Sequence, residues 1–412
     1  MRALEKQFQD VFTSINEAYS LVHKVVHRTP LVHSRTLSRL LCGEIYLKLE
    51  CLQRTGSFKI RGAYYAISKM KDAIMSRGCV AASAGNHAQG VAFAASSLGI
   101  RAVIVMPTFS PTAKVQATIG YGAEVILHGK TYDEAVAEAS RICDERNSVF
   151  IHSFDNPAVI AGQGTIGLEM MEDLPDLDVI IVPVGGGGLI SGVSVAVKNL
   201  NPEVAIYGVQ AAGSASMVAS LKKGNLVNLQ NVDTIADGIA IKRPCRLTFD
   251  IIRRLVDEVV VVTDDEIADA TFLLLERTKQ VVEPAGAVGL AALLSKKIDV
   301  TGKNVGVIIS GGNIDMSLLV RIVERSLYKE SRFVKISGLL FDRPGILQNV
   351  LSIIANYKAN VVTINHDRTD PRISLGKTRI TLTLELPEKQ YLHDLTKNLE
   401  EAGYLFSTTQ YP

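Results

Sequence analysis

Short runs of valine and isoleucine alternate with amphipathic helical stretches through the first 310 residues, and this alternation restricts the fold more than any other feature. Runs that are apolar on both faces are typical of buried parallel strands. They cover residues 101–107, 123–128, 178–184, 205–210 and 304–310. Helical patterns such as 131–146 and 265–279 stand between them. We therefore expect an open parallel α/β sheet with helices on both faces.

The pattern changes near residue 330, where we expect a domain boundary. The remaining chain predicts strand, helix, strand, strand, helix and strand, over residues 332–340, 345–358, 360–366, 378–386, 388–401 and 404–409. This βαββαβ order is the ferredoxin-like arrangement. The expected domains are residues 1–328 and 332–412.

Composition gives no reason to expect a nucleic acid or an anionic membrane as partner. The 412 residues carry 44 basic and 42 acidic side chains, for a net charge of +2. No apolar run approaches the roughly 18 residues of a membrane span. The N-terminal MRALEKQFQD lacks the apolar core of a signal peptide. Five cysteines, an odd number without a C-x-x-C pair, favour a reduced, cytoplasmic setting.

Three glycine-rich turns each follow an apolar run, within residues 80–90, 182–192 and 307–313. Ligands of open α/β sheets bind beyond the carboxyl ends of the strands, where such turns gather. The second turn, VPVGGGGLISG, has four consecutive glycines before a helix. Backbone N–H groups and the helix N-terminus would favour a phosphate there. The alternative is a flexible turn, which rarely stands between a buried strand and a helix.

Two nucleotide-binding motifs are poorly supported. The four glycines are not a P-loop, because no Lys-Ser or Lys-Thr follows them. GQGTIG, residues 162–167, matches G-x-G-x-x-G, but a helix-like segment precedes it where a strand is required. Asp178 starts the next strand instead of ending it. We therefore do not expect a dinucleotide site.

Other signals are weaker. His23 and His27 have the i, i+4 spacing of metal ligands, but no third ligand is near, so no metal site is expected. Tyr64 and Tyr65 are expected in a helix, where they pack in the core.

The stretch TGSFKIRGA, residues 55–63, places Lys59 between an aromatic ring and Arg61. A lysine outside a P-loop, together with a phosphate site, indicates pyridoxal 5'-phosphate. This cofactor needs a phosphate site, a lysine for its aldehyde and a partner for its ring nitrogen.

The chain closely resembles the fold-type II pyridoxal-phosphate enzymes, the tryptophan synthase β family, and within them the threonine ammonia-lyases. The resemblance covers about residues 10–325. It rests on SFKIRGA, SAGNHAQG, NPAVIAGQGT, VGGGGL, TIADGIA, EPAGA and SGGN, which occur in the family's order.

The resemblance implies a role for each matching residue. Lys59 would bond to the cofactor and be the catalytic residue, with Phe58 against the ring. Asn86 would contact the ring hydroxyl and Ser310 the ring nitrogen. The phosphate would be held by Gly185, Gly186, Gly187, Gly188 and Leu189. The substrate would be bound by Ser83, Ala84, Gly85, Asn86, His87, Gly238 and Glu283.

The implied reaction is β-elimination from threonine, giving 2-oxobutyrate and ammonia, with serine giving pyruvate. Alternatives are a cysteine synthase-like enzyme, a serine racemase or dehydratase, and a non-catalytic amino-acid sensor. Serine racemases carry a serine where this chain has Ala84, so racemisation should be weak. Relatives that bind a divalent cation use a glutamate where Gln210 stands, whereas a monovalent cation remains possible.

Residues 332–412 resemble an ACT domain, a module that senses small molecules. The match is LLFDRPGIL, residues 339–347, where Pro344 can start a helix and Gly345 can let a ligand approach the backbone. The resemblance implies an amino-acid effector, with isoleucine and valine as leading candidates. It also implies a homo-oligomer, a dimer or tetramer. The alternative is an inert dimerisation module.

Overall fold

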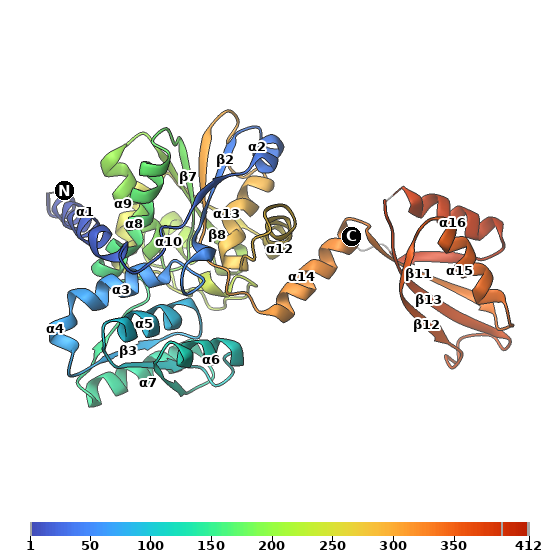
Figure 1. Ribbon diagram of the computed structural model, residues 1–412, viewed down its shortest axis with the longest axis horizontal. Helices are drawn as coiled ribbons and strands as arrows, with labels where there is room; N and C mark the ends of the chain where they lie inside the picture. The colour runs from blue at the N-terminus through green and yellow to red at the C-terminus, as the bar shows by residue number, and fades with distance from the viewer. Residues whose placement is uncertain (1, 389, 410–412) are drawn as a thin grey trace. The chain divides into compact units, whose positions relative to one another are not determined.

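The computed structural model describes residues 2–388 and 390–409 and divides the chain into two compact units, Met1–Asp315 and Met316–Pro412 (Figure 1). The sequence places the functional boundary slightly later, at about residue 330, and that division stays a prediction. Residues 410–412 of the expected second domain lie outside the described residues.

The first unit contains a six-stranded sheet of order β1-β2-β10-β7-β8-β9. All neighbouring strands are parallel except the β1–β2 pair. The strands are β1 (Leu31–His33), β2 (Glu44–Leu49), β7 (Val179–Pro183), β8 (Ala205–Ala211), β9 (Glu258–Val262) and β10 (Asn304–Ile309). The associated helices are α1 (Arg2–Val22), α2 (Arg35–Leu41), α8 (Pro157–Asp173), α9 (Gly188–Leu200), α10 (Ser216–Lys223), α11 (Arg246–Leu255), α12 (Asp264–Leu273) and α13 (Pro284–Leu294). Short 3-10 turns are η1 (Glu50–Leu52), η2 (Ala212–Ser214) and η3 (Asp237–Ile239), and a π-helical turn, η4 (Leu274–Thr278), continues α12.

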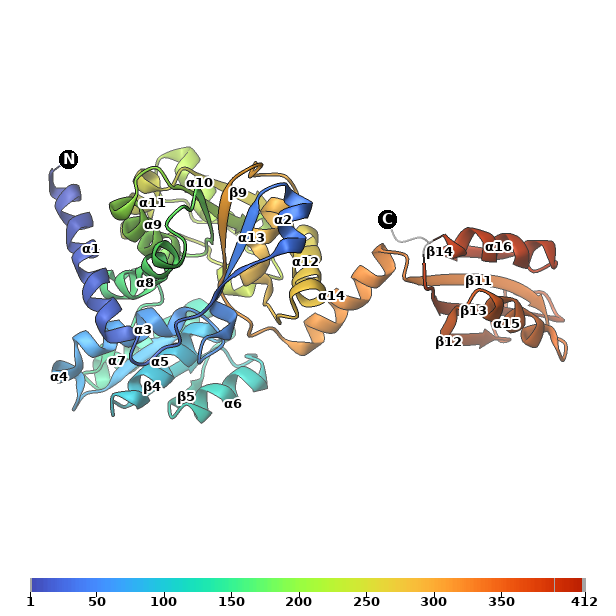
Figure 2. The same ribbon diagram turned by 45° about the horizontal axis from the view of Figure 1, so that its top comes forward.

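A second, four-stranded parallel sheet of order β5-β4-β3-β6 belongs to the same unit and lies below the larger sheet in both ribbon views (Figures 1 and 2). Its strands are β3 (Cys79–Ala82), β4 (Ala102–Met106), β5 (Glu124–Leu127) and β6 (Val149–Phe150). The helices of this lobe are α3 (Lys59–Lys69), α4 (Lys71–Ile74), α5 (Asn86–Ser97), α6 (Thr112–Gly120) and α7 (Tyr132–Glu145). The expected α/β architecture is confirmed, with its parallel strands shared between two sheets.

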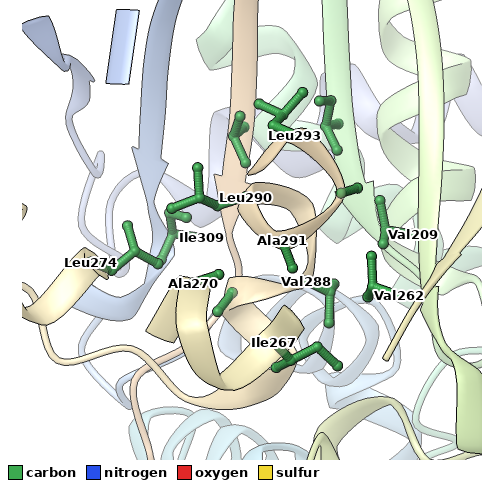
Figure 3. Close-up of a cluster of buried hydrophobic side chains, with 14 of the residues drawn as sticks. Val209, Val262, Ile267, Ala270, Leu274, Val288, Leu290, Ala291, Leu293 and Ile309 are labelled. Atoms are coloured by element: carbon green, nitrogen blue, oxygen red, sulfur yellow. The ribbon is translucent and has the colours of Figure 1, made fainter. Parts of the chain in front are cut away.

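The largest apolar core lies around α13, whose sequence PAGAVGLAALL is apolar on all sides. Such a helix is stable only when it is buried all round. Leu290 and Leu293 contribute to a cluster that also includes Val209 of β8 and Ile267 of α12 (Figure 3). Burying these side chains is the main apolar driving force for the lobe that holds the larger sheet.

Two strands depart from the expectation of uniformly apolar, buried runs. β5 is parallel as expected, but it lies at the edge of its sheet, and Glu124 and Leu127 are exposed, so the expectation of a buried strand is wrong here. β2 is buried over four of its six positions, including Lys48. It was missed because a lysine interrupts its apolar pattern.

The structure supports no ligand-binding role for the glycine motif GQGTIG or for the pair His23 and His27. GQGTIG falls inside α8 and is buried there, so it is not the turn between a strand and a helix that a dinucleotide needs. α1 ends at Val22, so His23 and His27 do not share a face of that helix. Tyr65 is buried in the core as expected, and Tyr64 packs against it.

The second unit begins with α14 (Met316–Lys329) and continues as the expected βαββαβ sequence. Its elements are β11 (Phe333–Phe341), α15 (Ile346–Asn356), β12 (Asn360–Asp367), β13 (Lys377–Glu385), α16 (Tyr391–Glu401) and β14 (Phe406–Thr409). The sheet is antiparallel, of order β12-β13-β11-β14, and consistent with an ACT-like domain. Burial alternates along β11, as expected for a strand with one covered face.

The start of α15 differs from the expectation. The helix begins at Ile346, and Gly345 is its N-cap with φ of 90°. Pro344 therefore does not start the helix, because the left-handed residue after it turns the chain first.

Among the described residues, no helix combines the length and the apolar character that a bilayer crossing requires.

Candidate active site

A cavity of about 280 Å³ in the first unit brings the predicted site residues together. Its lining draws on the chain segments that follow β3, β7 and β10, at the carboxyl ends of parallel strands. Each predicted residue lines this cavity: Phe58, Lys59, Ser83, Ala84, Gly85, Asn86, His87, Gly185, Gly186, Gly187, Gly188, Leu189, Gly238, Glu283 and Ser310. Their individual roles stay predictions.

Lys59 is the first residue of α3 and is half-buried in the cavity. Its Nζ donates a hydrogen bond of 3.2 Å to the Ser153 carbonyl oxygen and lies 5.2 Å from the centre of the Phe58 ring. Burial lowers the pKa of Lys59 to about 8, although the nearby Glu283 carboxylate acts in the opposite direction. A neutral amine is therefore accessible close to neutral pH.

The glycine turn joins β7 to the N-terminus of α9. A methyl group on Gly186 would lie 2.4 Å from the Phe154 ring, so the backbone approaches the neighbouring loop more closely than any other residue type allows. The first N–H groups of α9 have no acceptor within the helix. Together with the helix dipole they make a suitable site for a phosphate.

Two residues that line the cavity, Asn86 and Glu283, belong to a hydrogen-bonded chain of amide and carboxyl groups. Asn313 Nδ2 donates to Asn86 Oδ1 at 2.7 Å, and Asn86 Nδ2 donates to Glu283 Oε1 at 2.7 Å. Burial, with a further contribution from Asp237, raises the pKa of Glu283 to about 7. This carboxyl can therefore exchange a proton near neutral pH.

Two other predicted residues are buried and hydrogen-bonded to the backbone of neighbouring segments. His87 is buried with Nε2 2.9 Å from the Ile151 carbonyl oxygen, and burial lowers its pKa to about 3. Ser310 follows β10, is 3% exposed, and accepts a hydrogen bond of 3.1 Å on its carbonyl oxygen from the Phe58 N–H. A neutral hydroxyl thus stands at the strand end where the resemblance places the ring nitrogen.

Sequence reasoning missed an ion pair at this cavity. Lys114 of α6 and Asp237 of η3 both line it, and their side chains are 2.7 Å apart. The pair joins α6, packed beside the smaller sheet, to a turn in the lobe of the larger one. The two residues are far apart in sequence and meet only in the folded chain. No local sequence pattern could therefore have predicted the pair.

The geometry fits pyridoxal phosphate. A glycine turn at a helix N-terminus, a lysine of lowered pKa and a buried neutral hydroxyl surround one cavity. These are the three features that the cofactor requires.

Among the described residues, no group of three or more His, Cys, Asp or Glu side chains could hold a metal ion. Gln210 is fully buried, and its amide is paired at both ends. Nε2 donates to the Ser214 carbonyl oxygen at 3.2 Å, and Oε1 accepts from the Val218 N–H at 2.9 Å.

A second cavity, of about 470 Å³, lies in the second unit. It is lined by the segment Leu340–Leu347 and by His366, Arg368, Thr378 and Ile380. Asp342 accepts two hydrogen bonds from Arg368 at its edge. The cavity therefore combines apolar walls with both signs of charge.

Fold and site define a class of enzyme that uses pyridoxal phosphate on two parallel α/β lobes. The model of the family described as "Pyridoxal-phosphate dependent enzyme" matches residues 22–311, and the chain belongs to this family. The fold-type II resemblance and the expected cofactor are thereby confirmed.

Particular relatives are similar along most of the chain. The L-threonine ammonia-lyase of Thermotoga maritima is 51% identical, over 95% of this chain and 97% of that protein. The processed form of threonine deaminase isoform 2 from Solanum lycopersicum has a TM-score of 0.75 and 39% identity, covering 77% of this chain and 88% of that chain. Maize serine racemase has a TM-score of 0.73 and 38% identity, covering 78% and 98% respectively.

Proposed function

We propose that this chain is a threonine ammonia-lyase, which converts L-threonine to 2-oxobutyrate and ammonia and L-serine to pyruvate. The observation that carries the proposal is the single cavity where Lys59, Asn86, the four glycines and Ser310 meet. Similarity to an L-threonine ammonia-lyase over 95% of the chain supports the choice of substrate.

Lys59 is the central residue of the proposed mechanism. Bound pyridoxal phosphate supplies an electron-accepting ring beside the α-carbon of the substrate. The Nζ of Lys59 would hold the aldehyde carbon of the cofactor, and the same amine would accept the α-proton of the substrate. Its pKa of about 8 suits a group that gains and loses a proton near neutral pH.

Ser310 selects the type of reaction. A neutral hydroxyl does not stabilise a protonated ring nitrogen as a carboxylate would, so the ring remains a weaker electron acceptor. A ring that accepts electrons weakly would favour loss of the β-hydroxyl over return of a proton to another carbon. Elimination is favoured over transamination.

The remaining residues bind and orient the substrate. The loop Ser83–His87 would receive the substrate carboxylate at the N-terminus of α5, and Asn86 would contact the ring hydroxyl of the cofactor. Ala84 has no proton to give to the opposite face of the α-carbon, and this argues against the racemase alternative despite the similarity to maize serine racemase.

The function is tested by measuring oxoacid and ammonia release from L-threonine, L-serine and D-serine. We expect equal amounts of 2-oxobutyrate and ammonia from threonine. O-Acetylserine with sulfide tests the cysteine synthase-like alternative. Formation of cysteine without deamination of threonine would refute the proposal, and absence of any cofactor absorbance would favour the non-catalytic sensor.

We also propose that the second unit binds an amino-acid effector in its cavity of about 470 Å³. Asp342 and Arg368 can pair with the ammonium and carboxylate groups of an amino acid, while Leu340 and Ile380 offer apolar contact. Isoleucine and valine are the leading candidates, which would link the enzyme to isoleucine biosynthesis.

A homo-oligomer follows from the same proposal. β12 lies at the sheet edge, and Val361, Val362 and Ile364 on it are exposed. A second copy that pairs with this edge would cover these side chains and satisfy the free backbone groups. Light scattering tests whether the protein is a dimer or a tetramer.

The cysteine content leads us to propose the cytoplasm as the compartment of this protein, and the five thiols are free.

A further inference from the structure

Four charged side chains are buried together where α3 packs against η1 and α8, and they lie outside the cavity. Lys48, Glu50 and Arg61 are 0% exposed and Glu169 is 1% exposed. They come from β2, η1, α3 and α8, so the cluster joins four separate elements. Two cations balance two anions, and none of these residues lines the candidate active site.

Arg61 is the centre of this charge cluster. Its Nε and Nη2 donate to the two carboxylate oxygens of Glu50 at 2.9 and 2.8 Å. Its Nη1 and Nη2 donate to the two carboxylate oxygens of Glu169 at 2.7 and 2.9 Å. Thr165 Oγ1 accepts a further bond from Nη1 at 3.2 Å. Only a planar guanidinium can bind two carboxylates in this way.

Lys48 and Thr29 complete the cluster. The Lys48 Nζ lies 2.7 Å from Glu169 Oε2 and donates to the Thr29 carbonyl oxygen at 2.6 Å. The Thr29 hydroxyl donates to Glu50. Each carboxylate therefore has at least two donors, which is the condition under which buried charges are tolerated.

The position of the cluster relative to Lys59 is the important observation. Arg61 follows Lys59 by two residues, and Glu50 precedes the loop that leads to it. The Glu50–Arg61 ion pair therefore joins the two ends of the segment that contains Lys59. The N-cap of α3, Phe58, makes no side-chain capping hydrogen bond, so the helix start depends on contacts of this kind.

Stability alone does not account for four buried charges. Replacing a buried ion network by apolar side chains of similar volume is often neutral or stabilising. What such a replacement removes is directional hydrogen bonding, which fixes one geometry among several. The element fixed here is the first turn of α3, on which Lys59 stands.

We propose that the charge cluster of Lys48, Glu50, Arg61 and Glu169 positions Lys59 toward the cofactor, with Arg61 as the positioning residue. The Arg61 guanidinium holds the first turn of α3 against η1 and α8. The Lys59 side chain therefore enters the cavity with one fixed orientation of its Nζ. Turnover depends on that direction, because a small misplacement of a reacting group slows catalysis strongly.

The test compares two variants of the holoenzyme with the wild type. The first is Arg61→Lys, which keeps the charge and loses the planar fork. The second replaces the whole cluster by apolar residues: Lys48→Met, Glu50→Leu, Arg61→Met and Glu169→Leu. The measurements are the unfolding temperature, kcat for threonine, and the visible circular dichroism of the bound cofactor, which reports how rigidly the ring is held. Rates are divided by the folded fraction.

For Arg61→Lys we expect the unfolding temperature to fall, because Glu50 and Glu169 lose buried hydrogen-bond donors. We also expect kcat per folded enzyme to fall at least about tenfold and the visible circular dichroism of the folded protein to weaken. The apolar variant should show the same losses of kcat and circular dichroism while still folded. The matched control is Arg146→Lys, because Arg146 donates two hydrogen bonds to Glu124 on the exposed edge strand β5, away from the cluster. This control should leave all three measurements unchanged.

Two results would overturn the proposal. One is a folded variant with wild-type kcat and circular dichroism. The other is a loss of activity that the loss of folded protein fully explains, since the cluster would then serve stability. The inference rests on the proposed function only for kcat. If the wild type fails to deaminate threonine, the function fails, while the circular dichroism still decides whether the cluster positions Lys59.

Discussion

Two ionisable side chains of the cavity, Lys59 and Glu283, have pKa values that are shifted toward neutrality from opposite sides. Burial disfavours the charged form of each, so the amine becomes more acidic and the carboxyl less acidic. Each also attracts the charge of the other, which limits both shifts. A site with two groups that titrate near pH 7 is suited to proton transfer.

The Glu283 shift predicts a pH-dependent stability. The folded pKa of about 7 lies above the ordinary value of 4.5, so its contribution to folding is fully present below pH 4.5 and is lost as pH rises through 7. Glu283→Gln removes this loss. The unfolding free energy of the variant minus that of the wild type should therefore rise by about 3 kcal/mol between pH 4.5 and pH 8. Denaturant titrations across this range measure the difference, and a difference that is constant with pH would contradict the assignment.

At the residue scale, local motifs predicted the lining of the site better than its charge pairs. Lys59 was singled out by its neighbours in TGSFKIRGA, whereas Asn86 and Ser310 were assigned through the family resemblance, on the motifs SAGNHAQG and SGGN. Lys114, Asp237 and the partners of Arg61 were not found, because a pair of charges brought together only by folding leaves no local pattern.

The glycine turn between β7 and α9 is the element on which phosphate binding depends. Gly186→Ala would push a methyl group to within 2.4 Å of the Phe154 ring and force the turn to move. We expect cofactor affinity to fall at least about tenfold, because the N–H groups would lose their common direction. Fluorescence titration of the cofactor-free protein measures this.

Gly120→Ala in α6 is the matched control for this prediction. Nothing lies within 4 Å of the position that its methyl group would take, so affinity should not change. An equal loss in both variants would show that the turn is not special.

The Lys114–Asp237 pair links α6 to η3 at the cavity. Its carboxylate is 63% exposed, so the pair should contribute only about 0–1 kcal/mol to stability. Its effect should instead appear in substrate binding. Lys114→Asp and Asp237→Lys should each raise KM several-fold, and the double exchange should recover most of the loss, since it restores an attractive pair. Steady-state kinetics on the four proteins test this, and additive losses in the double variant would exclude a functional pairing.

At the element scale, most of the parallel strands that were predicted are runs with two apolar faces, whereas the apolar run of β9 was not predicted. β4, β7, β8 and β10 fulfil that condition almost completely. β2 does not, because Lys48 belongs to a charge cluster that exists only in the folded chain. The distribution of the strands over two sheets also escaped prediction, since hydrophobic patterning identifies strands without saying which ones pair.

For the whole molecule, the regulatory proposal predicts that activity and effector response can be separated. A chain that stops at residue 328 retains every predicted site residue. It should deaminate threonine and no longer respond to isoleucine or valine. In the full chain, the effector should change apparent affinity by about 5- to 150-fold. Titration of both forms with these amino acids decides the matter, and an equal response of the shortened chain would make the second unit merely structural.

The central claim is that Lys59 carries the cofactor and the proton transfer. The most direct measurement is borohydride reduction of the holoenzyme followed by peptide mass spectrometry, combined with the turnover of Lys59→Ala. We predict that the reduced cofactor is attached to the peptide containing Lys59, and that Lys59→Ala loses activity by several orders of magnitude, because one group serves as both anchor and base. Attachment to another lysine, or near-normal threonine deamination by Lys59→Ala, would contradict the account.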